Sequence, residues 1–163
     1  MSKISVLYYS KSGNTKAMAE HIASGAGKVE GVSAKAFSIE NIDEAWVKES
    51  QCVILGSPVY MASVSAKIQT WLQNSAKAFG LAGKIGGAFA TANFVHGGGD
   101  LAIRTILDHM MVFGMLTYSG GGAFGQPPIH LGPVAIGGKL DESVALFEEY
   151  GRRMATRTKA IFG

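Results

Sequence analysis

The chain has 163 residues, of which 47% are hydrophobic and 17% charged, with a net charge of +3 and a pI of about 9.0. This composition predicts one compact domain spanning residues 1–163 and excludes an intrinsically disordered chain. The single cysteine, Cys52, excludes an internal disulfide, and no metal-ligand spacing surrounds it. It is interpreted as a small buried hydrophobe, with a catalytic thiol as the less favoured alternative.

Neither a leader segment nor a membrane span is predicted, because no apolar run near the start or elsewhere is long enough. The expected location is therefore the cytoplasm, with no membrane partner. A basic stretch at 151–159 lacks interleaved aromatic residues and any nucleic-acid-binding motif. It is interpreted as a solvated helix face, and nucleic acid is not expected as a partner.

Apolar strands and helical patterns alternate along the chain. Strands are predicted by short apolar or alternating runs at 3–10, 32–39, 52–58, 84–93 and 115–120, the third of them ended by Gly56 and Pro58. Helical spacing of apolar residues predicts helices at 15–27, 41–50, 63–79, 100–114 and 142–162. Strand followed by helix, five times over, predicts a doubly wound α/β domain with a parallel sheet. A Gly- and Pro-rich loop is predicted over 120–133, and no structure is evident over 120–140.

Ligands of such sheets bind at the carboxyl ends of the strands, so the loops after the strands are the expected functional segments. After the first strand come Ser10, Ser12, Asn14 and Thr15 around Gly13. Free amides at the start of the next helix, the helix dipole and these polar side chains together indicate a phosphate-binding loop. The alternative is ordinary helix capping, but one cap explains only one such residue. The spacing matches neither a Walker loop nor a dinucleotide fingerprint.

Two further loops have unusual composition. The segment GSPVYMASV at 56–64 places Val59, Tyr60 and Met61 after the third strand, which suits a flat aromatic ligand. The segment ATANFVHGGGD at 90–100 carries three glycines, together with Phe94 and His96. The alternatives are a loop that packs on the protein itself in the first case and a mobile glycine loop in the second.

These segments resemble a known family. YYSKSGNT resembles the phosphate loop of flavodoxins, and GSPVYMASVSAKIQTWLQNS looks like the second flavin loop of WrbA-type NAD(P)H:quinone oxidoreductases. The stretch from Gly83 to Met115 is similar to the third flavin loop of those enzymes and the helix that follows it. The resemblance covers residues 3–119. It implies a flavodoxin-like fold, with a five-stranded parallel sheet in the order 2-1-3-4-5 and helices on both faces.

The resemblance also implies that the cofactor is FMN, and it assigns positions to it. The phosphate would be held by Ser10, Ser12, Gly13, Asn14 and Thr15 with the backbone of Lys11. The isoalloxazine would be bordered by Pro58, Val59, Tyr60 and Met61 on one side and by Thr91, Ala92 and Asn93 on the other, with Gly97, Gly98 and Gly99 shaping the loop. No metal is expected.

Three functions are compatible with this resemblance. The favoured one is an FMN-dependent oxidoreductase that takes hydride from NAD(P)H and reduces a quinone or similar small acceptor. The alternative is a flavodoxin, an electron carrier with a protein partner. The net positive charge and the glycine-rich loops favour the enzyme, since carriers of this type tend to be acidic and to cover the flavin with aromatic residues. A regulatory protein that has lost its flavin is disfavoured by the intact first loop.

The enzyme reaction would need no protein nucleophile, because FMN itself carries the redox chemistry. Tyr60 and His96 are the candidate catalytic groups: Tyr60, with Phe94, as an outer wall, and His96 as a proton donor, unless it is a solvated loop histidine. His130 is a further candidate, contributed by a neighbouring subunit. The apolar segment 110–124 suggests self-association, so a homo-oligomer (dimer or tetramer) is expected.

Overall fold

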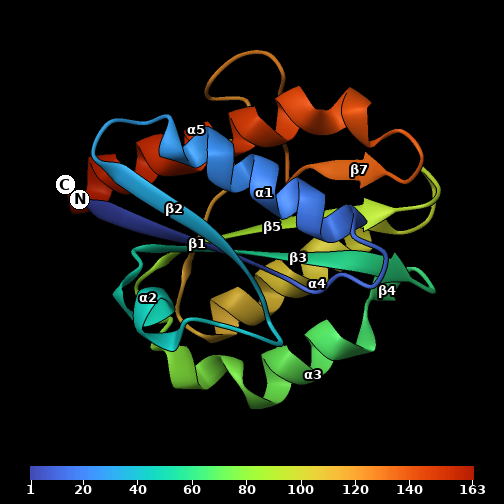
Figure 1. Ribbon diagram of the computed structural model, residues 1–163, viewed down its shortest axis with the longest axis horizontal. Helices are drawn as coiled ribbons and strands as arrows, with labels where there is room; N and C mark the ends of the chain where they lie inside the picture. Colours follow the sequence, from blue (N-terminus) through green and yellow to red (C-terminus); the bar gives the residue numbers. More distant parts are fainter.

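The computed structural model describes residues 1–163 and contains a central parallel sheet (Figure 1). Its main strands are β1 (Ser2–Tyr8), β2 (Val32–Ser38), β3 (Cys52–Tyr60), β5 (Ile85–Ala92) and β6 (Leu116–Thr117). They lie in the order β2-β1-β3-β5-β6. Counted as the five strands predicted from the sequence, this is the order 2-1-3-4-5. The doubly wound α/β prediction is therefore confirmed.

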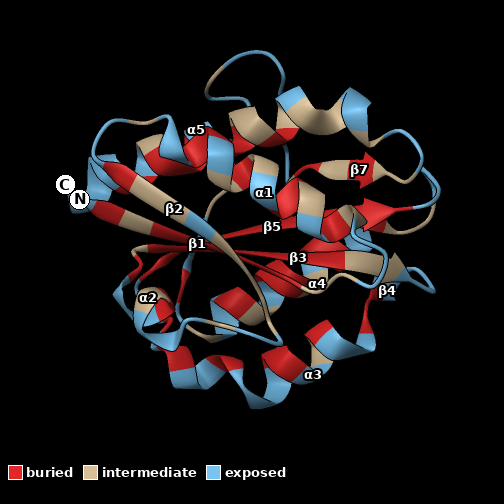
Figure 2. Ribbon diagram, viewed as in Figure 1, coloured by how far each residue is buried: buried red, intermediate tan, exposed pale blue.

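Helices cover both faces of the sheet (Figure 1). One face carries α1 (Asn14–Gly27) and α5 (Val144–Phe162); the other carries α2 (Glu44–Glu49), α3 (Ala66–Asn74) and α4 (Gly99–Val112). Each face has its own hydrophobic core, one built around Ile22, Phe89 and Phe147 and the other around Leu55, Ile68 and Ile106. The central strands are buried between them (Figure 2), which explains their nearly unbroken apolar sequences.

The prediction that the third strand stops at Gly56 and Pro58 is wrong. Strand β3 continues to Tyr60, because Pro58 still pairs with Thr91 of β5 after β1 has ended opposite Gly56. A proline is tolerated where a strand has lost its neighbour on one side. The chain then turns at 61–62 into the short antiparallel strand β4 (Ser63–Val64).

The helix predicted over 63–79 is shorter than expected. It begins after Ser65, whose hydroxyl accepts a hydrogen bond from the amide of Ile68 at 3.3 Å. It ends at Asn74, and a 3₁₀ turn follows over Ala76–Phe79. The apolar spacing continues through the break, so the sequence pattern did not reveal it. The serine cap sets the start because it satisfies a helix amide that would otherwise lack a partner.

The edge position of the sheet is shared by two short strands. β6 pairs with Ile85 and Gly86 at the start of β5, and β7 (Val134–Ile136) pairs with Ala90–Ala92 at its end. The segment 118–133 connects them. The prediction of no structure over 120–140 is therefore wrong for β7 and for the 3₁₀ turn at Leu140–Ser143. Three apolar residues are too few to give a strand pattern; pairing with β5 defines the strand.

The connecting segment is fastened to α5 by Arg153, whose side chain is fully buried. Its guanidinium donates hydrogen bonds to the backbone carbonyls of Pro127 at 2.7 Å and Gln126 at 3.3 Å. It also donates to the carboxylate of Glu149 at 2.7 Å and lies 5.3 Å from the ring centre of Phe124. A buried guanidinium needs this complete set of partners. The segment is consequently a fixed part of the fold.

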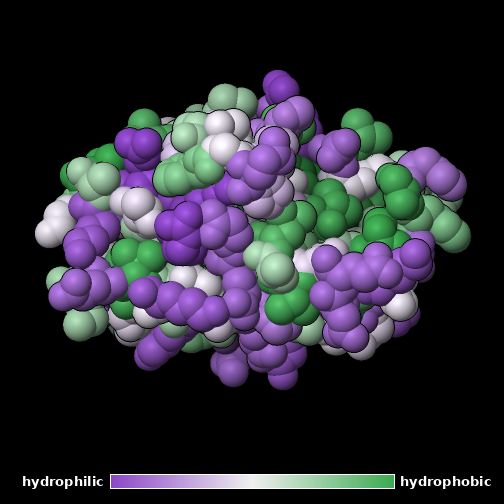
Figure 3. Space-filling view, turned by 90° about the horizontal axis from the view of Figure 1, so that it is seen from above, coloured by the Kyte–Doolittle hydropathy of each residue, from purple (hydrophilic) through white to green (hydrophobic).

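The apolar segment at 110–124 is only partly exposed. Met110 and Met115 belong to the core, whereas Met111, Val112 and Leu116 are exposed. Self-association through these residues stays a prediction. On the face seen from above, polar and apolar residues are interspersed (Figure 3). None of the helices is long and apolar enough to cross a membrane.

Candidate functional site

The three loops singled out in the sequence meet at the carboxyl ends of β1, β3 and β5, on the right in Figure 1. They enclose a small cleft of about 80 Å³. This is the place where strands β1 and β3 send the chain to opposite faces of the sheet, the usual ligand position in such folds. The lining residues are Lys11, Ser12, Asn14, Thr15, Pro58, Val59, Tyr60, Thr91, Ala92 and Asn93.

One wall of the cleft is the start of α1. Its N-cap is Gly13, with a φ of +96°, and no side chain caps the helix. Ser10 accepts a hydrogen bond from the Gly13 amide at 3.1 Å, which shapes the loop and does not cap α1. The first amides of the helix therefore remain free beside Ser12, Asn14 and Thr15, as an anion-binding site requires. The residues present fit a phosphate group.

The opposite wall is the end of β3, Pro58–Tyr60, which leads into the turn between β3 and β4. Met61 and Ala62 both have positive φ angles, 50° and 60°. This conformation is costly for residues with a side chain, and such strain is often found at functional turns. The loop after β5 packs directly on this turn: a Cβ at Gly98 would lie 2.6 Å from the Cα of Ala62. Gly98 must be glycine for the two loops to touch.

Not every predicted cofactor residue lines the cleft. Ser10 and Gly13 shape the phosphate loop from behind, and Met61 is 98% exposed at the tip of its turn. The stretch Gly97–Gly99 lies outside the cleft, with Gly98 against Ala62 and Gly99 against Val134. The remaining predicted residues meet at the cleft, and their contact with a cofactor stays a prediction.

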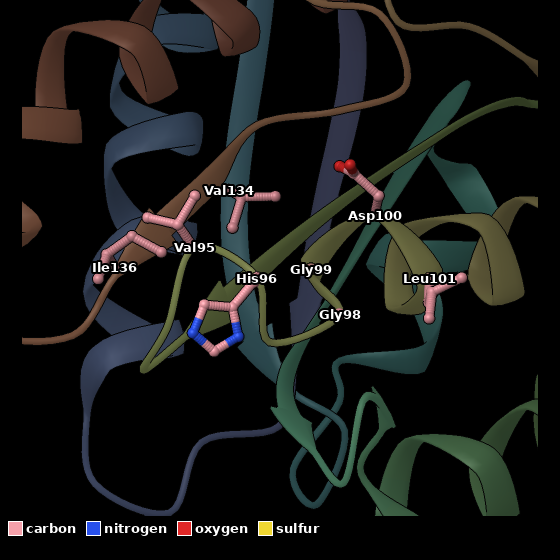
Figure 4. Close-up of a pocket in the computed structure, with 8 residues that line it drawn as sticks. All are labelled: Val95, His96, Gly98, Gly99, Asp100, Leu101, Val134 and Ile136. Atoms are coloured by element: carbon pink, nitrogen blue, oxygen red, sulfur yellow. The ribbon is translucent and has the colours of Figure 1, made fainter.

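Phe94 and His96 do not line this cleft either. They stack on each other, with ring centres 5.6 Å apart and planes 6° from parallel. His96 lines a neighbouring groove of about 570 Å³, between the β5–α4 loop and β7 (Figure 4). Val134 and Ile136 of β7 form another part of its lining. His130 is exposed in the segment 118–133 and lines a separate depression. The structure places none of the three in the lining of the cleft, and their expected roles as outer wall and proton donor stay predictions.

Sequence reasoning missed two features of the site. Gly137, after β7, donates its amide hydrogen to the carbonyl of Ala92 at 2.8 Å. A Cβ at Gly137 would lie 2.9 Å from the Asn93 side-chain oxygen and 3.5 Å from the Asn14 amide nitrogen. The second feature is a hydrogen bond between the hydroxyls of Thr15 and Thr91 at 2.8 Å. No local pattern signals either contact, because each joins segments far apart in the chain.

The cleft is otherwise lightly charged. Lys11 is the one ionic residue of its lining and is exposed. Tyr8 ends β1 nearby; burial, and then the negative charge of Glu20, raises the pKa of its phenol. Backbone amides, hydroxyls and the helix dipole therefore provide most of the attraction for an anion.

Fold and site together define an α/β protein with an uncapped helix start, facing Pro58, Val59 and Tyr60, at the switch point of a parallel sheet. The chain matches the family model described as Flavodoxin over residues 6–102. It is 42% identical to a flavodoxin of Clostridium saccharobutylicum, over 98% of this chain and 99% of that one. A flavodoxin of Aquifex aeolicus is 32% identical over 95% and 86%. The chain belongs to the flavodoxin family.

Solved structures agree with this assignment. A flavodoxin from the domain Archaea superposes with a TM-score of 0.79 at 25% identity, over 96% of this chain and 99% of that one. A WrbA-like flavodoxin from Agrobacterium tumefaciens gives 0.80 at 23% identity, over 98% and 99%, a likeness of fold alone.

The expectation of an NAD(P)H:quinone oxidoreductase is wrong. An NAD(P)H dehydrogenase (quinone) of Trichlorobacter lovleyi is only 27% identical, over 73% of this chain and 74% of the relative. The full-length flavodoxin relatives overturn the enzyme reading and favour the electron carrier. Gly98 and Gly99 allow the loop after β5 to pack on Ala62 and Val134, so glycine-rich loops do not distinguish an enzyme from a carrier here. Net charge is a property of the whole surface and did not discriminate between the two functions.

Proposed function

We propose that this chain is an electron-transfer flavodoxin that carries FMN in the cleft at the ends of β1, β3 and β5. The observation that carries the proposal is the uncapped start of α1, which lies in the same small cleft as Tyr60 and Asn93. Membership of the flavodoxin family supports FMN as the cofactor.

In this proposal the phosphate lies at the start of α1. The free helix amides and the backbone of Lys11 bind it, and Ser12, Asn14 and Thr15 add side-chain hydrogen bonds. Ser10 contributes by holding the Gly13 amide, and Gly13 by its positive φ. The phosphate dianion interacts favourably with the positive end of the helix dipole.

The ring system borders Tyr60 and its neighbours on one side and the end of β5 on the other. Pro58 and Val59 belong to the first wall, with Met61 exposed at its tip, and Thr91, Ala92 and Asn93 belong to the second. Gly97, Gly98 and Gly99 let the third loop pack on the turn at Ala62. FMN supplies one-electron redox chemistry when bound, and the chain holds it in place and limits water access.

The protein partner would dock around the cleft. Tyr60, Met61, Phe94 and Val95 are exposed apolar residues on the two loops that border it, with exposed fractions of 43%, 98%, 62% and 88%. Exposed apolar side chains gathered around a site are typical of interaction surfaces. A small net charge of +3 favours docking through these apolar contacts over long-range attraction.

The test uses the full chain loaded with FMN under anaerobic conditions. We expect the flavin absorbance to stay unchanged with NADH or NADPH alone, and to bleach in two separate one-electron steps when dithionite is titrated in. Adding a flavodoxin reductase should restore reduction by the nucleotide. Rapid bleaching by NADH or NADPH without a reductase would contradict the proposal, as would failure to bind FMN.

A further inference from the structure

The hydroxyl pair of Thr15 and Thr91 has an unused hydrogen. Thr15 lies in the first turn of α1 and Thr91 near the end of β5, 76 residues apart, with their Oγ1 atoms 2.8 Å from each other. Both residues line the cleft, yet they are 1% and 4% exposed. Neither hydroxyl makes another hydrogen bond within the chain.

Counting hydrogens shows what the pair lacks. Each hydroxyl has one hydrogen to donate and two lone pairs to accept, so the single bond between them uses one hydrogen of two. The other hydrogen has no acceptor in a place that water scarcely reaches. Leaving a buried donor without a partner is costly, and native structures rarely do so. The pair is therefore suited to a ligand that accepts a hydrogen bond.

The surroundings decide which hydroxyl faces the ligand. Thr15 belongs to the uncapped turn that presents free amides beside Ser12 and Asn14. Thr91 sits within the sheet, between Pro58 of β3 and Ala135 of β7. The anion site therefore lies on the Thr15 side of the pair, and Thr91 is one residue further from it.

We infer that Thr91 is a positioning residue for the FMN phosphate: it donates its hydrogen to Thr15, and Thr15 in turn donates to the phosphate. This rests on the proposed function. It assigns the hydroxyl of Thr91 to the phosphate end of the site, whereas the family resemblance implies a position of Thr91 beside the ring. A donor that itself receives a hydrogen bond is polarised and becomes a better donor, so the two bonds strengthen each other.

The test compares Thr91→Val, which keeps the shape and removes the hydroxyl, with Thr91→Ser, which keeps the hydroxyl. Each variant is titrated with FMN and with riboflavin, which has the same ring and side chain without the phosphate. We expect Thr91→Val to weaken FMN binding about tenfold, the effect of losing about 1.4 kcal/mol, and to change riboflavin binding less than about twofold. Thr91→Ser should bind FMN within about threefold of the original chain. Quenching of flavin fluorescence gives both affinities.

Urea unfolding of the apoproteins accompanies the titrations, so that a folding defect is recognised. The inference is overturned if Thr91→Val binds FMN as the original chain does. It is also overturned if FMN and riboflavin weaken equally, because the hydroxyl would then serve the ring or the fold. If the original chain binds neither flavin, the proposed function fails first and the inference fails with it.

Discussion

Lys84 shows how much of this fold depends on single side chains whose role is invisible in the sequence. It is 8% exposed at the start of β5, and its ammonium donates to the carbonyls of Val47, Lys48 and Ser50 at 2.8, 2.6 and 2.7 Å. These carbonyls end α2, where the helix dipole is negative. Burial lowers the pKa of Lys84, while the three carbonyls stabilise its charged form.

We predict that Lys84→Met lowers the free energy of unfolding by about 2–3 kcal/mol, because three carbonyls at the end of α2 lose a charged donor. Urea unfolding of the apoprotein measures the change. The matched control is Lys48→Met, which removes a half-exposed lysine from a surface pair with Glu44 at 3.4 Å. Lys48→Met should lower the free energy of unfolding by less than about 0.5 kcal/mol. If both variants lose the same free energy of unfolding, the hydrogen bonds of Lys84 stabilise the fold no more than a surface ion pair does.

At the scale of elements, the contact between α1 and α5 depends on two glycines. A Cβ at Gly25 would lie 1.9 Å from the Glu148 carbonyl oxygen, and one at Gly151 would lie 2.0 Å from the Ile22 carbonyl oxygen. Backbone touches backbone in both directions. The two helices are thereby held closely over one face of the sheet, and α1 in turn places the phosphate loop at the cleft.

Gly151→Ala should therefore lower the free energy of unfolding by about 3 kcal/mol, since backbone cannot yield as a side chain can. Thermal unfolding followed by circular dichroism is the measurement. Gly27→Ala is the control: Gly27 lies in α1, two residues after Gly25, but a Cβ there meets nothing within 4 Å. That variant should be neutral or slightly more stable, because alanine favours helix. A stable Gly151→Ala protein would mean that the helices can move apart freely.

At the scale of the whole molecule, Glu149 of α5 contributes to stability against acid, because it pairs with Arg152 and with Arg153, the residue that holds the segment 118–133. Glu149 accepts two hydrogen bonds from Arg152 and one from Arg153, all at 2.7 Å. These arginines, Arg152 first, lower the pKa of Glu149 to about 2. A carboxyl whose pKa is lower in the folded state stabilises the fold above its unfolded pKa of about 4.5. That stabilisation disappears as the pH falls toward 2.

Glu149→Gln should make the apoprotein less stable at pH 7, by about 1–2 kcal/mol after allowing for a side chain that is 25% exposed. Its stability should fall less steeply than that of the original chain between pH 5 and pH 2. Urea midpoints across this range give both slopes. Parallel curves for the two proteins would refute a special role for Glu149 in acid unfolding.

The sequence predicted the framework because its signals are local. Apolar runs and helical spacing located the main strands and all five helices, and the cluster around Gly13 located the uncapped start of α1. Boundaries were less accurate where neighbours decide them: β3 runs past Pro58 because β5 still pairs with it. β7 escaped notice because its three residues become a strand only by pairing.

By itself, the sequence therefore determined the alternation of strands and helices and the composition of the loop around Gly13. The resemblance to the flavodoxin family follows from these features. The tertiary structure decided which residues meet. Thr15 forms a hydrogen bond with Thr91, 76 residues further along the chain. Lys84 donates hydrogen bonds to carbonyls at the end of α2, and Arg153 donates to the carbonyls of Gln126 and Pro127. The physical reason is that a hydrophobic pattern specifies which face is buried, whereas a buried polar group must find a particular partner, and chain topology alone brings that partner within reach.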